Sequence, residues 1–175
     1  MKFLAPIAVA FALVLASAPT EARPRPAAGR SFRANKTFGL GVMLGAPSGL
    51  SGKYYMTQDT ALDFGLGVYH RFGHRDGLHA HADFLWHPVS LLGTPAFELP
   101  LYFGLGARIW DHDEYRNDYR EETHVGVRAP LGIIFDFNRI PLDIFLELAM
   151  VIDIVVDDDH SYADLNGALG VRYYF

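Results

Sequence analysis

The feature that most constrains this chain is a two-residue alternation that recurs in eight segments after residue 36. In each segment, Leu, Ile, Val or Phe occupies alternate positions, and Gly or a charged residue fills many of the positions between them. Because successive side chains of a β-strand point to opposite faces, each segment is expected to be a strand with one apolar face. The predicted strands are 37–46, 50–57, 60–70, 78–87, 99–110, 123–137, 141–155 and 165–175.

The chemistry of the two faces indicates which of them points outward. Glycines share a face with Lys53, Arg128 and Glu147, whereas the opposite face is almost purely aliphatic or Phe. A soluble eight-stranded barrel of the lipocalin type would turn the apolar face inward and the charges outward. An aliphatic outer face is stable only in lipid, and eight strands of about ten residues make the smallest transmembrane barrel. The predicted fold is therefore all-β, an eight-stranded antiparallel transmembrane β-barrel of the outer-membrane type.

The amino-terminal residues are expected to be a signal peptide that ends at residue 22. Phe3 to Ala16 carry no charge, and this run is too short to span a bilayer as a helix. Thr20 and Ala22 are the small residues expected before the cleavage site. Residues 23–36 are rich in Pro and Arg without periodicity, which predicts a disordered basic leader. The barrel is then expected to occupy residues 37–175.

Composition excludes several classes of function. The chain has no Cys, so it has neither disulfides nor thiolate metal sites. Of its 15 Lys and Arg residues, Lys2 and the five in the leader leave 9 for residues 37–175, against 19 acidic residues. A body with a net charge of 9 − 19 = −10 is not expected to bind nucleic acid.

The connections between the predicted strands differ in length and charge. If residue 37 starts at the periplasm, the cell-surface connections are 46–49, 71–77, 111–122 and 156–164. Three of these are the longest charged loops, and the periplasmic connections at 58–59 and 138–140 are short, as in outer-membrane barrels. The connection at 88–98 is longer than this pattern predicts. Pro130 in the middle of a predicted strand indicates a bulge, because it removes a ladder donor.

Several stretches carry a family resemblance. They are 39–55 (GLGVMLGAPSGLSGKYY), 81–87 (HADFLWH), 99–108 (LPLYFGLGAR), 127–133 (VRAPLGI), 141–149 (PLDIFLELA) and 164–175 (DLNGALGVRYYF). The chain resembles a family of small, mostly uncharacterised outer-membrane barrel proteins of bacteria, similar to the OmpA transmembrane domain. The resemblance implies a monomer in the outer membrane, whose partners are lipids including lipopolysaccharide and the barrel assembly machinery. It implies no cofactor and no catalytic residue, and it leaves any ligand of the surface loops unknown.

Three functions compete at this level: a non-enzymatic barrel, a lipid-modifying enzyme and a narrow channel. For an enzyme, His160 and Ser161 beside Asp157–Asp159 supply the residue types, but neighbours on a strand would face opposite sides. His79, His81 and His87 share a face with Asp83 and are candidate metal ligands. Since inward polar side chains are expected in any such barrel, we expect no catalytic residue and no metal site.

The inward charges are instead expected to pair and fill the interior. The candidate residues are Lys53, Asp83, Arg108, Arg128, Glu147, Asp153 and Arg172, with further acids at Asp63, Asp136 and Asp143. Counting along neighbouring strands places Glu147, or else Asp143, opposite Arg172, and places Asp153 within diagonal reach of Arg128. We expect a barrel plugged by these ion pairs that acts in membrane integrity or through contacts of its surface loops.

The end of the chain yields the first testable prediction. The last strand ends on Tyr173 and Phe175, and a terminal Phe that closes an alternating strand resembles the assembly signal of outer-membrane barrels. Replacing Phe175 with Lys is expected to reduce the yield of folded barrel in the membrane more than any single loop substitution, because the closing strand loses this signal. Equal membrane yields for Phe175→Lys and the parent would contradict this assignment.

Overall fold

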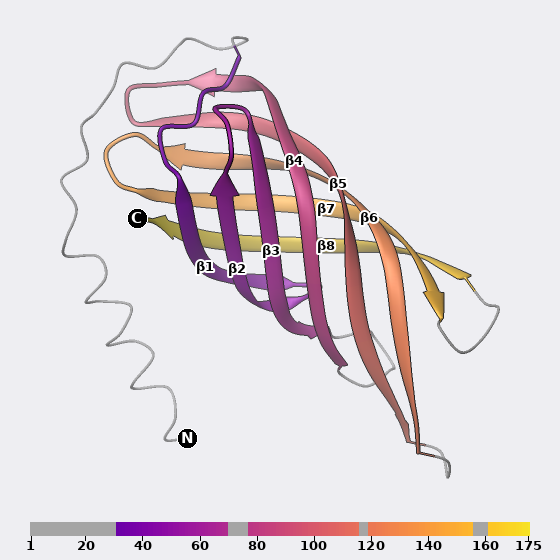
Figure 1. Cartoon of the computed structure of the whole chain (residues 1–175). Helices are drawn as coiled ribbons and strands as arrows, with labels where there is room; N and C mark the ends of the chain where they lie inside the picture. The colour runs from indigo at the N-terminus through magenta and orange to yellow at the C-terminus, as the bar shows by residue number, and fades with distance from the viewer. Residues whose placement is uncertain (1–30, 70–76, 116–118, 156–160) are drawn as a thin grey trace, which may run out of the picture.

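The computed structural model describes residues 31–69, 77–115, 119–155 and 161–175, which form a closed eight-stranded barrel (Figure 1). The strands are β1 (Phe38–Gly45), β2 (Ser48–Tyr55), β3 (Thr60–Tyr69), β4 (Gly77–Gly93), β5 (Phe97–Tyr115), β6 (Tyr119–Phe137), β7 (Leu142–Val155) and β8 (Ser161–Tyr174). Each strand pairs antiparallel with the next, and the predicted fold class is confirmed. The described residues contain no helix long and apolar enough to cross a membrane.

The barrel closes where its first strand meets its last. β1 pairs with β8 from Gly39 opposite Tyr174 to Gly45 opposite Ala168. Beyond β8, the backbone N–H of Phe175 donates a hydrogen bond of 2.9 Å to the carbonyl of Phe38. The final residue of the chain is therefore tied to the first strand.

The two ends of the barrel differ, and we name them by their connections. At the turn end, β1 begins, β8 ends, and short segments at 56–59, 94–96 and 138–141 join neighbouring strands. At the opposite, loop end, the β5–β6 hairpin reaches beyond the neighbouring strands (Figure 1). The predicted loop at 111–122 is thus mostly paired strand, with Tyr115 opposite Tyr119, and β8 begins at Ser161 inside the predicted loop 156–164. The prediction took charged residues as a sign of a loop. Strands that project beyond the barrel tolerate charged residues as well.

The long connection predicted at 88–98 is wrong. β4 continues to Gly93, and the turn is closed by a hydrogen bond of 2.9 Å from the Thr94 N–H to the Phe97 carbonyl. The pairing of β4 with β5 shifts register between Trp86 and Val89 and again between Ser90 and Gly93. Pro88 lies in the first of these irregularities, where its missing N–H interrupts no regular ladder.

The bulge predicted at Pro130 is also wrong. Pro130 pairs with Ala149 of β7 in an unbroken register. Toward β5, the pairs on either side of it, Phe103 with Leu131 and Gly106 with Arg128, keep one constant register across the gap. The strand therefore accommodates this proline without an extra residue.

The alternation of the sequence is reproduced as an exposed outer face and a buried inner face. On β7, Ile144, Leu146 and Leu148 are exposed, whereas Asp143 and Glu147 between them are buried. The same assignment holds on the other strands, so the predicted orientation of the faces is confirmed. Charged and polar side chains thus share the interior with a cluster of buried apolar residues, and aliphatic side chains form the outer surface.

The amino-terminal boundary needs a correction. Residues 31–36 were expected to belong to a disordered leader, but Phe32 is buried and Lys36 forms an ion pair with Asp136. One apolar and one cationic anchor order this segment, and neither could be recognised from a stretch without periodicity. The predicted signal peptide and residues 23–30 lie outside the described residues.

Candidate functional site

The candidate site is the charged interior, where four basic side chains are buried in the barrel. Arg108, Arg128 and Arg172 are 1–2% exposed and Lys53 is 0% exposed. Each arginine binds two carboxylates that come from two different strands. The carboxylates that β7 contributes follow one another along that strand, so the three arginine groups lie at successive depths from the turn end to the loop end.

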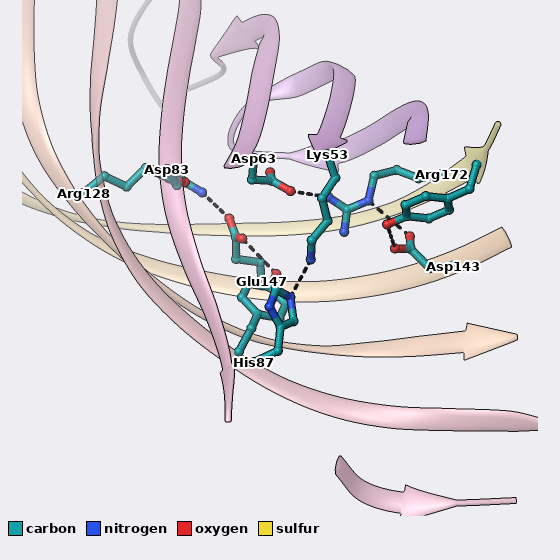
Figure 2. A network of polar contacts seen from close by, with 10 residues as sticks. Lys53, Asp63, Asp83, His87, Arg128, Asp143, Glu147 and Arg172 are labelled. Atoms are coloured by element: carbon teal, nitrogen blue, oxygen red, sulfur yellow. Dashed lines mark hydrogen bonds and ion pairs between the residues drawn. The ribbon is translucent and has the colours of Figure 1, made fainter. Parts of the chain in front are cut away.

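The group nearest the turn end is built on Arg172 of β8 (Figure 2). Its Nε donates to Oδ1 of Asp143 at 3.2 Å, and a terminal nitrogen bonds to Asp63 across the barrel. The Tyr174 hydroxyl donates to the other oxygen of Asp143 at 2.6 Å. The guanidinium carbon also lies 4.1 Å from the centre of the Phe145 ring. This group joins β3, β7 and β8.

The middle group is built on Arg128 of β6. Its Nε donates to Oδ2 of Asp83 at 2.7 Å, and a terminal nitrogen bonds to Glu147. The Tyr102 hydroxyl donates to the second oxygen of Glu147 at 2.8 Å. A buried carboxylate is stable only with such partners. Here Arg128 of β6 holds both Asp83 of β4 and Glu147 of β7, and Tyr102 of β5 adds a second donor to Glu147.

The group nearest the loop end is built on Arg108 of β5. It binds Asp153 with two nitrogens, one of them Nε at 2.9 Å from Oδ1. It also donates to Oδ1 of Asn166 at 2.8 Å and to Asp164 at 3.2 Å. A fork of two nitrogens on one carboxylate is the strongest geometry available to an arginine.

Lys53 differs from the arginines because its nearest polar partner is a histidine. Its Nζ lies 2.8 Å from Nε2 of His87, as Figure 2 shows. The same Nζ lies 5.0 Å from the ring centre of Tyr55 and 4.9 Å from that of Tyr102. The ammonium is therefore surrounded by aromatic faces, which attract a cation.

The structure confirms one of the ion pairs considered from the sequence and corrects the other. Arg172 binds Asp143, the alternative considered, and Glu147 binds Arg128 instead. Asp153 binds Arg108 rather than Arg128. Register counting places Asp143 opposite Arg172 and Arg128 diagonal to Asp153, and the structure has both placements. It does not reveal contacts between strands that are not neighbours, such as that of Arg172 with Asp63.

Several partners were missed by sequence reasoning. Asp164 had been assigned to a loop, yet it binds Arg108 and accepts a hydrogen bond from the Tyr69 hydroxyl. Tyr102 and Tyr174, whose hydroxyls donate to Glu147 and Asp143, were not among the predicted site residues. A signal was available, because a tyrosine on a face of glycines and charges has few apolar neighbours and must find a polar partner for its hydroxyl.

Inner glycines make room for the charged groups. A Cβ added at Gly126 would lie 2.0 Å from Oδ1 of Asp153, its register partner on β7. One added at Gly106 would lie 2.1 Å from Oδ1 of Asp83, its register partner on β4. The glycines noted in the sequence therefore stand beside the large or charged side chains that they accommodate.

The candidate metal ligands do not come together as a metal site. The rings of His79 and His81 lie 5.3 Å apart, whereas His87 contacts Lys53 and Asp83 binds Arg128. Among the residues that the structure describes, no three His, Asp or Glu side chains form a group that could hold a metal ion. His160 and Asp157–Asp159 lie outside the described residues, so the pairing of His160 with Ser161 is not tested.

The ion pair of Arg172 with Asp143 yields a prediction for stability. Arg172→Ala and Asp143→Ala are each expected to lower the free energy of unfolding by about 3–5 kcal/mol, because each leaves a buried charge without its partner. The double variant should lose less than the sum of the two, as measured by denaturant unfolding of the purified barrel. Arg172→Ala with Glu147→Ala is the matched control and should come closer to additivity. Strict additivity for Arg172 and Asp143 would show that their contact contributes no coupling energy.

Comparison with known proteins supports the fold independently. No protein-family model matches the sequence, and a search of curated proteins gives no match either. Among solved structures, the chain is similar to the N-terminal β-barrel domain of Pseudomonas aeruginosa OprF, with a TM-score of 0.56 and 18% sequence identity. The alignment covers 79% of this chain and 95% of the OprF domain. The chain therefore has the fold of an OmpA-like eight-stranded barrel.

Proposed function

We propose that this chain spans the outer membrane as a monomeric, non-enzymatic barrel with a plugged interior. Its role would be to maintain membrane integrity or to present its loops at the cell surface. The observation that carries the proposal is the combination of an aliphatic outer surface with three buried arginine groups. Neither the aliphatic outer surface nor the charged interior suits a protein surrounded by water.

The outer surface supports a lipid environment. Every strand exposes at least one large aliphatic or Met side chain, with exposed fractions from 49% to 70%: Leu44, Leu50, Leu66, Leu78, Leu105, Val127, Met150 and Leu165. An apolar surface that runs around the whole barrel far exceeds the patches found on soluble monomers. In a bilayer the same surface faces hydrocarbon, while the closed sheet leaves no unpaired strand edge there.

Exposed aromatic residues gather at the turn end. They include Phe38, Tyr54, Trp86, Phe135 and Phe175, whereas the exposed Phe64 lies further along β3 and the exposed Phe103 lies beside Trp86. Aromatic side chains form girdles where outer-membrane barrels meet the membrane–water interface. Short connections face the periplasm in such barrels, so the turn end is the proposed periplasmic side, and the β5–β6 hairpin would lie at the cell surface. Lipopolysaccharide and the barrel assembly machinery are the proposed partners.

The interior supports a plug rather than a channel. An eight-stranded barrel is just wide enough for side chains to fill it. Each arginine group reaches across the interior, as in the contact of Arg172 on β8 with Asp63 on β3. An ion would have to displace charges that already have partners at three depths.

Planar-bilayer recording tests the plug. We expect the purified wild type to insert without steady unit conductance, because the three arginine groups block the path. The matched comparison removes the middle group by combining Asp83→Ala, Arg128→Ala and Glu147→Ala, with folding checked by heat-dependent migration on gels. A large and steady conductance from the wild type would establish a channel instead.

The depth of the lipid-facing residues provides a second test. Leu142 begins β7 at the turn end, and Leu146 lies four residues further along the strand. Leu146→Arg is expected to lower the free energy of unfolding in lipid vesicles by about 2–4 kcal/mol, because it places a charge at the bilayer midplane. Leu142→Arg, the matched control, should cost far less, since its charge can reach the interface. Equal losses would contradict the proposed position of the barrel in the membrane.

A further inference from the structure

The segment before β1 enters the mouth of the barrel at the turn end. Phe32 is 1% exposed, and its ring centre lies 5.5 Å from that of His87 and 6.1 Å from that of Tyr55. Phe32 and Tyr55 form a buried apolar cluster with Ala61 and Tyr174. The Tyr174 hydroxyl links this cluster to the Arg172 group through Asp143. A residue expected in a solvated leader is therefore among the most buried residues of the molecule.

A second anchor lies four residues further along the chain. The Lys36 ammonium donates to the carbonyls of Phe137 and Leu142, each at 3.1 Å, and bonds to Asp136. It also lies 5.2 Å from the ring centre of Tyr174. This cation closes the junction of β6 and β7 from inside the barrel.

The contacts of this segment join opposite walls of the barrel. The Ala34 N–H donates a hydrogen bond of 2.7 Å to the carbonyl of Gln58, between β2 and β3. Lys36 binds at the junction of β6 and β7. In a closed ring of eight strands, these two junctions are four strands apart and thus diametrically opposite. The segment therefore crosses the mouth, at the end of the barrel where the C terminus also lies (Figure 1).

The segment is attached differently from the strands. Residues 31–37 belong to no strand, and their contacts are a ring in an aromatic cluster, an ammonium on the rim and individual backbone hydrogen bonds. Such an attachment can open without breaking the closed sheet, because local segments with few backbone bonds unfold before the core does.

We propose that residues 31–37 are a built-in plug that closes the turn-end mouth and opens independently of the barrel. The Phe32 side chain fills the mouth, and the Lys36 ammonium fastens the segment to the rim. Opening would expose a vestibule lined by Tyr55, Ala61 and His87, with Asp136 at its rim, while the arginine groups above it stay closed. This plug is distinct from the ion-pair plug, and it does not depend on the proposed role in the membrane.

Cysteine accessibility tests the plug directly, since the chain has no native Cys. Ala61→Cys places a single thiol in the cluster beneath Phe32, at a position that is 0% exposed. The rate of its modification by a charged thiol reagent is measured on the folded, purified chain in detergent. Phe32→Ala with Lys36→Ala removes both anchors. Arg33→Ala is the matched control, because it removes one positive charge from an exposed side chain of the same segment.

We expect slow modification in the parent and in Arg33→Ala, and an increase of about tenfold or more when both anchors are removed, because the opening equilibrium shifts. A second reporter, Ala168→Cys, lies in the other buried cluster and should stay slow throughout. Heat-dependent gel migration verifies that each variant is folded. Should the double variant fail to fold, Lys36→Ala alone is measured, and a smaller increase is expected.

Three results would overturn the plug. The first is fast modification at position 61 in the parent, which would mean that the mouth is open. The second is an unchanged rate after loss of the anchors. The third is an equal increase at positions 61 and 168, which would show that the whole barrel loosens rather than one end opening.

Discussion

The pairing of β1 with β8 is the constraint on which the rest of the structure depends. It turns a sheet into a ring, so that no strand edge remains along the barrel wall. Once the ring is closed, its inner and outer faces are separated, and a two-residue alternation sends each side chain to one or the other. The aliphatic surface and the charged interior are both consequences of this closure.

The interior of the closed ring must be filled largely with polar and charged side chains. The space inside eight strands is filled by three arginine groups and by a cluster of buried apolar residues that includes Leu85 and Ile134. Glycines on neighbouring strands provide the room. Pairing one arginine with two carboxylates links strands that share no hydrogen bonds, such as β3 and β8 through Asp63 and Arg172. The contacts that neutralise the charges therefore also connect strands on different sides of the barrel.

The fold was predictable from the sequence because alternation is a local property. The faces of β7 follow directly from its order of aliphatic and acidic residues. The ion pairs were less predictable, since register counting considers neighbouring strands, whereas Arg172 reaches across the barrel to Asp63. The place of Phe32 could not be predicted, because one apolar residue among prolines and arginines forms no pattern. Its burial depends on a cavity that only the closed ring creates.

The long span of these ion pairs constrains the order in which the barrel can assemble. Asp63 and its partner Arg172 are 109 residues apart, so the Asp63 carboxylate has no such partner until the last strand joins the sheet. During that interval an open sheet inserted in hydrocarbon would hold an unpaired charge, at a cost of several kcal/mol. Strands crossing one by one from the amino terminus would therefore be unstable at each step. A membrane-spanning barrel of this design is expected to assemble nearly all at once, with the early strands kept in a polar environment until the carboxy-terminal strand is available.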